Sequence, residues 1–174
     1  MAFGRSARRD EPPELSLDLS ERLAPYGDQE MDPKPRVVAA HVGSDVRLVI
    51  VDDLPAIRTM MTLAVSLFDG ISIVGEASGA GEAVKVCEQL QPDAILLDVD
   101  MPEMSGLEAI PLLRAVAPEA KIAMYSNDET SRQAAVAAGA DGFFLKLSIP
   151  PVAVLAEIAD LCEDAPKRIP DDLT

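Results

Sequence analysis

The sequence has no tryptophan, and aromatic residues make up only 3% of its 174 residues. A hydrophobic core must therefore be aliphatic, and the 48% hydrophobic content supplies enough side chains for one full-sized domain. Long apolar runs are also lacking, since none approaches the roughly 20 residues that a membrane span needs. The Arg-bearing amino-terminal segment lacks the apolar centre of a signal peptide. The sequence therefore predicts a cytoplasmic protein without a membrane partner.

Cysteine, histidine and positive charge are scarce. The two cysteines, Cys87 and Cys162, fall at apolar positions of expected helices, which favours core thiols over a disulfide or metal pair. The one histidine, His41, lies in a linker-like stretch and is expected to be solvated. Only 15 Lys and Arg oppose 30 Asp and Glu, a formal net charge of -15. This charge disfavours nucleic acid and anionic lipid as direct partners, and it favours proteins and divalent cations.

The composition changes near residue 44. Residues 1–44 contain five prolines and show no sustained periodicity, which predicts a mostly disordered arm with one helix-forming stretch near 14–24. The arm has 6 basic and 8 acidic residues, whereas the rest has 9 and 22, so the acidity belongs to the expected domain at 45–164. Residues 165–174 are expected to form a short tail. That tail is too short for a DNA-binding module, so we expect a domain that acts alone or is cut from a longer protein.

From residue 46 onward, apolar runs alternate with helical patterns. Runs typical of buried strands occur at 47–51, 71–77, 94–97, 121–125 and 142–146. Helical patterns follow them at 55–68, around 84–90, at 106–116, at 129–138 and after 150–151. The third helix opens with the capping-box pattern of Ser105 and Glu108. Five such units predict a doubly wound parallel α/β sheet that is covered on both faces.

Polar residues follow four of these strands at their carboxyl ends. Asp52 and Asp53 follow the first strand, Asp98 the third, Ser126 the fourth and Lys146 the fifth. The carboxyl ends of parallel strands share one edge, so we expect these side chains to converge there. Carboxylates in such proximity repel each other unless a cation lies between them. Hard oxygen donors from few residues are typical of a Mg²⁺ site, and Lys146 would add a fixed positive charge.

Each of these residues also has a simpler interpretation. Asp53 fits a helix cap, Asp98 a turn residue and Lys146 a surface lysine. Their joint position at the ends of the expected strands favours one shared site.

Four segments resemble the marks of response-regulator receiver domains, in order and in spacing: LVIVDD, ILLDVDMPEMSG, IAMYS and AGADGFFLK. The resemblance covers about residues 46–162 and is strongest with receivers that are joined to helix-turn-helix output domains. It implies a flavodoxin-like (βα)5 fold with strand order 2-1-3-4-5. It also implies a bacterial cytoplasmic protein of two-component signalling, which catalyses only its own phosphorylation and dephosphorylation.

The resemblance implies a chemical role for each acid. Asp98 resembles the phosphoacceptor, which takes a phosphoryl group from the phosphohistidine of a sensor histidine kinase or a histidine phosphotransfer protein. Asp53 resembles the direct Mg²⁺ ligand and Asp52 its water-linked neighbour. The Asp98 carboxylate and the backbone carbonyl of Asp100 would complete the protein ligands. Lys146 resembles the lysine that binds first the acceptor carboxylate and then the phosphoryl group.

The resemblance also implies a switch. Ser126 and Phe143 occupy the positions of the switch hydroxyl and the switch aromatic residue. Their movement would change the surface made by residues 129–138, 142–146 and the last helix, to which a downstream protein target would bind. Homodimerisation through the same helices is an open alternative. Asp100, Asn127 and Asp128 occupy positions that tune dephosphorylation.

Two alternatives remain open at this point. A pseudo-receiver would use the same fold for protein binding without phosphotransfer, and Asn127 and Leu147 favour it because they depart from the usual family pattern. A haloacid-dehalogenase-like phosphatase would explain Asp98, Asp100, Ser126 and Lys146. That class, however, places its acidic pair after the nucleophile strand, whereas Asp52 and Asp53 come before it. A dinucleotide-binding site is excluded, because GEASGAGEAV breaks the glycine fingerprint.

Overall fold

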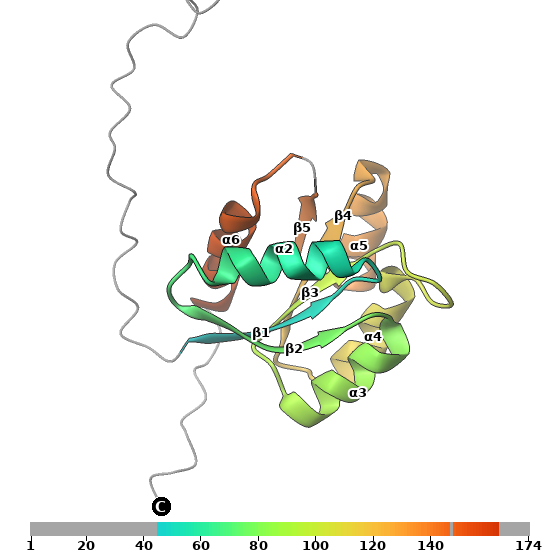
Figure 1. Ribbon diagram of the computed structural model, residues 1–174. Coiled ribbons are helices and arrows are strands. Elements are labelled where there is room, and N and C mark those ends of the chain that lie inside the picture. Colours follow the sequence, from blue (N-terminus) through green and yellow to red (C-terminus); the bar gives the residue numbers. More distant parts are fainter. Residues whose placement is uncertain (1–44, 147, 164–174) are drawn as a thin grey trace, which may run out of the picture. The chain divides into compact units, whose positions relative to one another are not determined.

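The computed structural model describes residues 45–146 and 148–163. Five strands lie in this part of the chain: β1 (Val46–Val51), β2 (Ile71–Ala77), β3 (Ala94–Asp98), β4 (Lys121–Ser126) and β5 (Gly142–Leu145). They form one parallel sheet in the order β2-β1-β3-β4-β5 (Figure 1). The predicted parallel sheet and its strand order are therefore confirmed. The predictions for the arm, for its segment near 14–24 and for His41 lie outside the described residues.

The helices follow the strands as predicted, with two differences. They are α2 (Pro55–Val65), α3 (Ala80–Leu90), α4 (Gly106–Val116), α5 (Arg132–Ala138) and α6 (Pro151–Glu163), with a 3-10 turn η1 (Glu129–Ser131) before α5. Helix α2 ends three residues before the predicted end, because the amides of Leu67 and Phe68 bond to carbonyls three residues back. The predicted helix at 129–138 begins as η1 for a related reason. The Asp128 side chain accepts a hydrogen bond from the amide of Thr130 and caps a tight turn.

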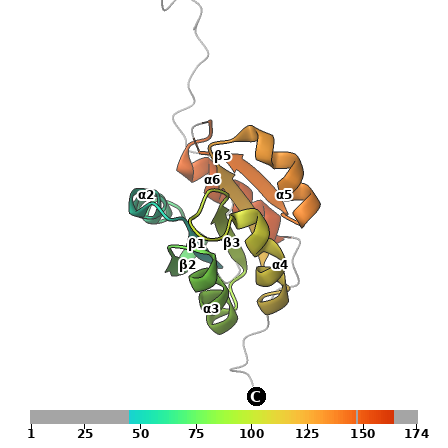
Figure 2. The ribbon, with the colours of Figure 1, turned by 90° about the vertical axis from the view of Figure 1, so that its right-hand side faces the viewer.

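Both faces of the sheet are covered (Figure 2). Helices α2 and α6 pack over the face that carries Leu48, Ile50 and Leu96. Helices α3, α4 and α5 pack over the opposite face. Successive residues of a strand point to opposite faces, so continuous apolar strands feed both cores at once. Among the described residues, no helix is long and apolar enough to cross a membrane.

Charged side chains at the amino-terminal end of the sheet form hydrogen bonds with backbone groups. Asp93, just before β3, accepts a hydrogen bond from the backbone amide of Arg47 at 2.9 Å. The guanidinium of Arg47 donates to the carbonyls of Leu90 and Gln91, at 2.8 and 2.7 Å, where α3 ends. These bonds satisfy carbonyls that have no partner within the helix.

Asp141 plays a similar part just before β5. Its carboxylate accepts a hydrogen bond from the amide of Ile122 at 2.8 Å and forms ion pairs with Arg114 and Lys121. Arg114 also donates to the carbonyls of Ala120 and Gly139, at 2.6 and 2.9 Å. The charges at this end therefore tie helices and strands together.

Candidate functional site

Asp98 is the last residue of β3, a strand whose residues are all buried. Only 3% of the residue is exposed to solvent. Burial raises the pKa of the Asp98 carboxyl group, and the nearby ammonium of Lys146 opposes that rise. An ionised carboxylate in this position is costly to desolvate unless a cation lies against it.

Lys146 follows β5 and supplies that cation. Its Nζ lies 2.7 Å from Oδ2 of Asp52 and 3.0 Å from Oδ2 of Asp98, and the side chains are only 4%, 2% and 4% exposed, in that order. Burial lowers the pKa of Lys146, but the hydrogen bonds to the two carboxylates outweigh it, so the net shift is upward. The Nζ also lies 5.6 Å from the centre of the Tyr125 ring. Lys146 therefore stays charged between two acids.

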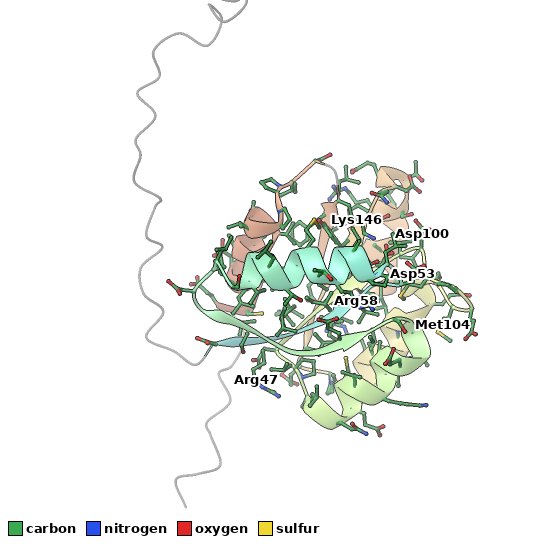
Figure 3. The ribbon with its side chains drawn as sticks, in the orientation of Figure 1. Arg47, Asp53, Arg58, Asp100, Met104 and Lys146 are labelled. Atoms are coloured by element: carbon green, nitrogen blue, oxygen red, sulfur yellow. The ribbon has the colours of Figure 1, made fainter. Side chains whose placement is uncertain are left out.

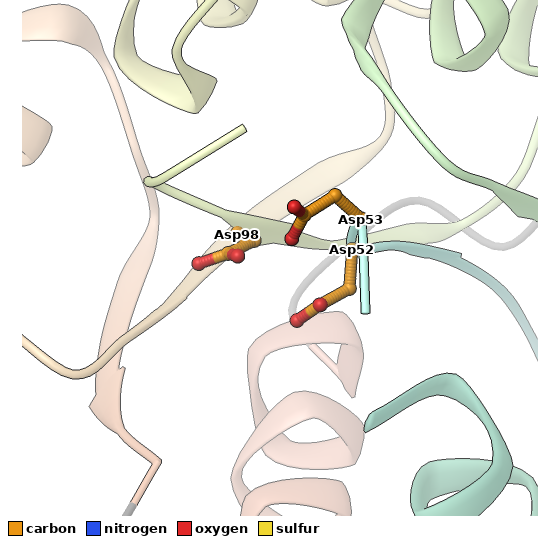
Figure 4. Close-up of side chains that lie close together, drawn as sticks. All are labelled: Asp52, Asp53 and Asp98. Carbon is orange, nitrogen blue, oxygen red and sulfur yellow. The ribbon is translucent and has the colours of Figure 1, made fainter. Parts of the chain in front are cut away.

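The two acids after β1 are held differently. Oδ1 of Asp52 accepts a hydrogen bond from the amide of Leu54 at 2.9 Å, and its Oδ2 binds Lys146. The carbonyl of Asp52 accepts a hydrogen bond from Arg58 at 2.7 Å. Asp53 is more exposed than Asp52. One carboxylate oxygen from each of Asp52, Asp53 and Asp98 lies within 4.8 Å of the other two (Figure 4). This is a donor set that suits a hard divalent cation.

The start of α4 fixes the position of the Asp98 backbone. The amide of Gly106 donates to the carbonyl of Val99 at 2.9 Å. A Cβ atom on Gly106 would lie 1.9 Å from the carbonyl oxygen of Asp98, so only glycine allows this approach. The predicted capping box of Ser105 and Glu108 is present and begins the helix at this point.

Asp100 lies at the rim of the site. It is exposed, and its amide lies 3.4 Å from Oδ1 of Asp98. Figure 3 shows Asp53, Asp100 and Lys146 at one end of the sheet, with Arg47 at the other. The structure thus brings Asp52, Asp53, Asp98 and Lys146 together, with Asp100 beside them.

Ser126 ends β4 at the same edge. Its carbonyl accepts a hydrogen bond from the amide of Lys146 at 2.9 Å, and its Oγ accepts one from the amide of Asp128 at 3.0 Å. Asn127 is exposed at the rim. The carboxylate of Asp128 accepts three hydrogen bonds from Thr130 and Ser131. Asp128 therefore caps η1, and the tuning role that was predicted for it stays a prediction.

Phe143 lies within β5 and is 7% exposed. Its ring belongs to the core beneath α3, α4 and α5. The guanidinium carbon of Arg132 lies 4.7 Å from the centre of that ring. The predicted departure at Leu147 lies outside the described residues.

Four residues that contribute to the site were not predicted from the sequence: Arg58, Gly106, Tyr125 and Arg132. Gly106 had a local signal, because it stands between the strand-ending acid and a helix. The other three act through neighbours that are distant in sequence, and their local patterns are those of ordinary helix or strand residues. The buried hydroxyl of Tyr125 has no hydrogen-bond partner among the described residues, and burial raises its pKa.

A family model for the response regulator receiver domain matches residues 48–157. The chain belongs to this family. Receiver domains bind Mg²⁺ at an acidic pocket and interact with kinases, phosphotransfer proteins and targets. The acid cluster at the ends of β1 and β3 corresponds to such a pocket.

Three known proteins illustrate the similarity. The nitrate/nitrite response regulator protein NarL of Escherichia coli (strain K12) is 39% identical over 101 residues, which are 57% of this chain and 47% of NarL. A protein-glutamate methylesterase/protein-glutamine glutaminase of Maricaulis maris is 38% identical over 93 residues, 53% of this chain and 23% of that protein. The crystal structure of a LuxR-family two-component response regulator from Aurantimonas superposes with a TM-score of 0.63 and 30% identity, covering 70% of this chain and 89% of that one.

The chain spans about half the length of NarL and about a quarter of the methylesterase. Receiver domains are generally not enzymes themselves, and relatives such as the methylesterase are enzymes through other domains. What this chain shares with these proteins is therefore the receiver domain.

Proposed function

We propose that residues 45–164 form a receiver domain that accepts a phosphoryl group on Asp98 from a sensor histidine kinase or a histidine phosphotransfer protein. The observation that supports this most directly is the buried Asp98 carboxylate, held 3.0 Å from Lys146 and within 4.8 Å of two further carboxylates. In the transfer, an oxygen of Asp98 attacks the phosphorus and forms a P–O bond. The P–N bond to the donor imidazole breaks, and the imidazole nitrogen keeps the electron pair and takes up a proton.

The charge balance of the site supports a divalent cofactor. Three carboxylates against one ammonium leave a formal charge of -2, which one divalent cation neutralises. Asp53 and Asp98 would bind Mg²⁺ directly, together with the carbonyl of Asp100, and Asp52 would bind it through water. The bound ion would supply positive charge to the equatorial oxygens of the phosphoryl group, where charge develops during transfer. Lys146 keeps its ammonium beside Asp98 and pairs with the new phosphoryl group.

The output of this receiver is a protein-binding surface formed by α5, β5 and α6. The aspartyl phosphate would be a new dianion beside the end of β4, and the Ser126 hydroxyl would turn toward it. Phe143, in the neighbouring strand, would move with Ser126 and change this surface. The acidic charge of the domain supports a protein target over nucleic acid. Asp100, Asn127 and Asp128 line the exposed rim, where an attacking water would approach, and would set the lifetime of the phosphate.

Intact-mass spectrometry after incubation with acetyl phosphate and Mg²⁺ tests the proposal. One added phosphoryl group that hydroxylamine removes is expected on the wild-type chain. No addition is expected on Asp98→Asn or without Mg²⁺, whereas Asp160→Asn, an exposed acid on α6, should behave as the wild type.

Phosphorylation of Asp98→Asn would contradict the assignment of the acceptor. Failure of the wild-type chain with both acetyl phosphate and phosphohistidine donors, while Mg²⁺ still binds, would establish a pseudo-receiver instead.

A further inference from the structure

The backbone carbonyl of Asp52 is held by a side chain where the sheet ends. The Asp52 amide donates to the carbonyl of Ala77, the last residue of β2, at 3.1 Å. Beyond Ala77 the strand gives no further ladder bond, and Nη1 of Arg58, in the first turn of α2, donates to the Asp52 carbonyl at 2.7 Å (Figure 3). Asp52 is buried, and a buried carbonyl needs a partner. Arg58 therefore takes the place of a neighbouring strand.

Glu76 of β2 fixes the orientation of the Arg58 guanidinium. Its Oε2 accepts a hydrogen bond from Nε of Arg58 at 3.2 Å, and its Oε1 accepts one from the hydroxyl of Thr62 at 3.2 Å. The Arg58 side chain is 19% exposed and the Glu76 side chain 43%. Such a partly exposed ion pair contributes little to stability by itself. Its consequence here is the direction in which the guanidinium points.

A bulge in β2 turns Glu76 toward Arg58. The register between β1 and β2 shifts by one position, which leaves Val74 as an extra residue on β2. Ile73, just before the bulge, packs toward the core under α2 and α6. In a regular strand, a residue three positions later would point to the opposite face. The extra residue brings Glu76 back to the α2 face, where Arg58 and Thr62 bind it.

The backbone that Arg58 holds carries two of the three clustered acids. Asp52 and Asp53 leave this turn side by side, and one carboxylate oxygen of each lies within 4.8 Å of one from Asp98. The Asp52 carboxylate is also tied to the turn, because its Oδ1 accepts a hydrogen bond from the amide of Leu54. A change in the position of the turn therefore moves donor atoms of the cluster.

We propose that Arg58 is a positioning residue for the divalent-cation site, and that Glu76, placed by the bulge, orients it. The inference rests on the function proposed above, which places Mg²⁺ at the acid cluster. Mg²⁺ demands near-ideal octahedral geometry, whereas Ca²⁺ accepts flexible arrangements of oxygen ligands. A turn that is fixed by Arg58 therefore favours Mg²⁺ over Ca²⁺ at this cluster.

The charge of Arg58 by itself predicts the opposite effect. A guanidinium near a cation site repels the ion, so removal of the charge alone would raise the affinity for Mg²⁺. Loss of the hold on the Asp52 carbonyl would lower it. The direction of the change in affinity thus separates positioning from charge.

Isothermal titration calorimetry of the full chain with Mg²⁺ and with Ca²⁺ tests the proposal. Arg58→Met is expected to lower the affinity for Mg²⁺ by about tenfold, the size typical of a residue that orients metal ligands. The affinity for Ca²⁺ should fall less. Arg58→Lys keeps the charge without the planar fork and should also lower the affinity for Mg²⁺. Glu76→Gln should give a smaller decrease, because a neutral acceptor holds the guanidinium less firmly.

A second measurement needs no metal ion. Amide exchange of Leu54 in the presence of a chelator reports the hold on the turn, and it should rise in Arg58→Met and, by less, in Glu76→Gln. Lys85→Met removes an exposed cation from α3 and should change neither the affinities nor the exchange. Urea denaturation shows that each variant is folded, and Arg58→Lys and Glu76→Gln carry the test if Arg58→Met unfolds.

A higher affinity for Mg²⁺ in Arg58→Met, with unchanged exchange of Leu54, would overturn the proposal, because Arg58 would then act through its charge alone. Equal losses of affinity for Mg²⁺ and Ca²⁺ would overturn the selectivity. If the wild-type chain binds neither ion while Arg58→Met still raises the exchange of Leu54, the cofactor of the proposed function fails and the hold on the acid pair stands.

Discussion

The two ends of the sheet contain the same kinds of charged residue in opposite arrangements. At the amino-terminal end, the acids are matched: Asp141 lies against Arg114 and Lys121, and Asp93 and Asp141 each accept a backbone amide. At the carboxyl end, Asp52 and Asp98 share the ammonium of Lys146, and a carboxylate oxygen of Asp53 lies within 4.8 Å of oxygens of both acids. The first arrangement joins helices to strands. In the second, the three carboxylates outnumber the one ammonium that pairs with them.

This difference separates structural charge from functional charge. A buried or half-buried acid with a full set of partners lowers the free energy of the folded state relative to the unfolded state, or leaves it unchanged. An acid cluster with too few cations raises it. Surplus acid at one edge therefore indicates a site whose missing charge comes from outside the chain, and the following substitutions test that distinction.

The largest effect is expected for Lys146→Met. The substitution leaves Asp52 and Asp98 buried without their cation, which should lower the free energy of unfolding by about 3 kcal/mol in the presence of a chelator. Mg²⁺ should then stabilise the variant more than it stabilises the wild type, because the site is more negative. Urea denaturation with and without Mg²⁺ measures both quantities. Equal stability of variant and wild type in chelator would show that the acids do not need this cation.

Gly106→Ala should have the next largest effect. The added Cβ would meet the carbonyl oxygen of Asp98 at 1.9 Å, so α4 or the end of β3 must move, at a cost of about 2 to 3 kcal/mol. Gly81 is the matched control, because it also lies in the first turn of a helix but has open space around it. Gly81→Ala should be neutral or stabilising through helix propensity. Equal thermal denaturation midpoints for the two variants would refute the close approach.

Asp141→Ala tests the amino-terminal end of the sheet, where the acids have partners. It removes the acceptor of the Ile122 amide and the partner of Arg114, and we expect a loss of about 2 kcal/mol in unfolding free energy that Mg²⁺ does not restore. Asp100→Ala, an exposed acid at the opposite end, should change stability by less than about 0.5 kcal/mol. Restoration of Asp141→Ala by Mg²⁺ would mean that the two ends are not independent.

Asp53→Asn should have the smallest effect and the opposite sign. Removing one surplus negative charge relieves repulsion, so in chelator the unfolding free energy should rise by up to about 1 kcal/mol. The stabilisation by Mg²⁺ should fall at the same time, because a ligand has been lost. Isothermal titration calorimetry gives the Mg²⁺ affinity, and urea denaturation gives the stability. A variant that is less stable than the wild type in chelator would place Asp53 among the structural acids.

The sequence was sufficient for the fold and for the edge at which the acids gather. Continuous apolar strands located the sheet, and the capping box of Ser105 and Glu108 located the start of α4. The contacts at the amino-terminal end of the sheet were not predicted. Asp93 and Asp141 each stand immediately before a strand, a position that could have indicated that they bond to neighbouring strands. Their partners come from other strands and helices, and local patterns do not specify which ones meet.

The same limit applies within the site. Arg132 has the pattern of an exposed helix residue, and only the packing of α5 beside β5 places it over Phe143. Asp128 was identified by its distance from Ser126 along the chain, whereas its hydrogen bonds show that it also caps η1. Residues that meet because they end neighbouring strands can be predicted from the sequence. Contacts that depend on which strand a helix packs against cannot be predicted in this way.

The contact between Lys146 and Asp52 has a consequence for the synthesis of the protein, because it joins residues 94 positions apart. The ribosome delivers Asp52, Asp53 and Asp98 before it delivers Lys146. A nascent chain therefore carries the acids while it still lacks the cation that offsets their repulsion. Pairing across such a separation is slow, since a long loop must close first. The order of translation thus makes the docking of β5 the event that completes the acid cluster. An unfinished chain holds Asp98 without the positive charge that offsets the cost of its burial.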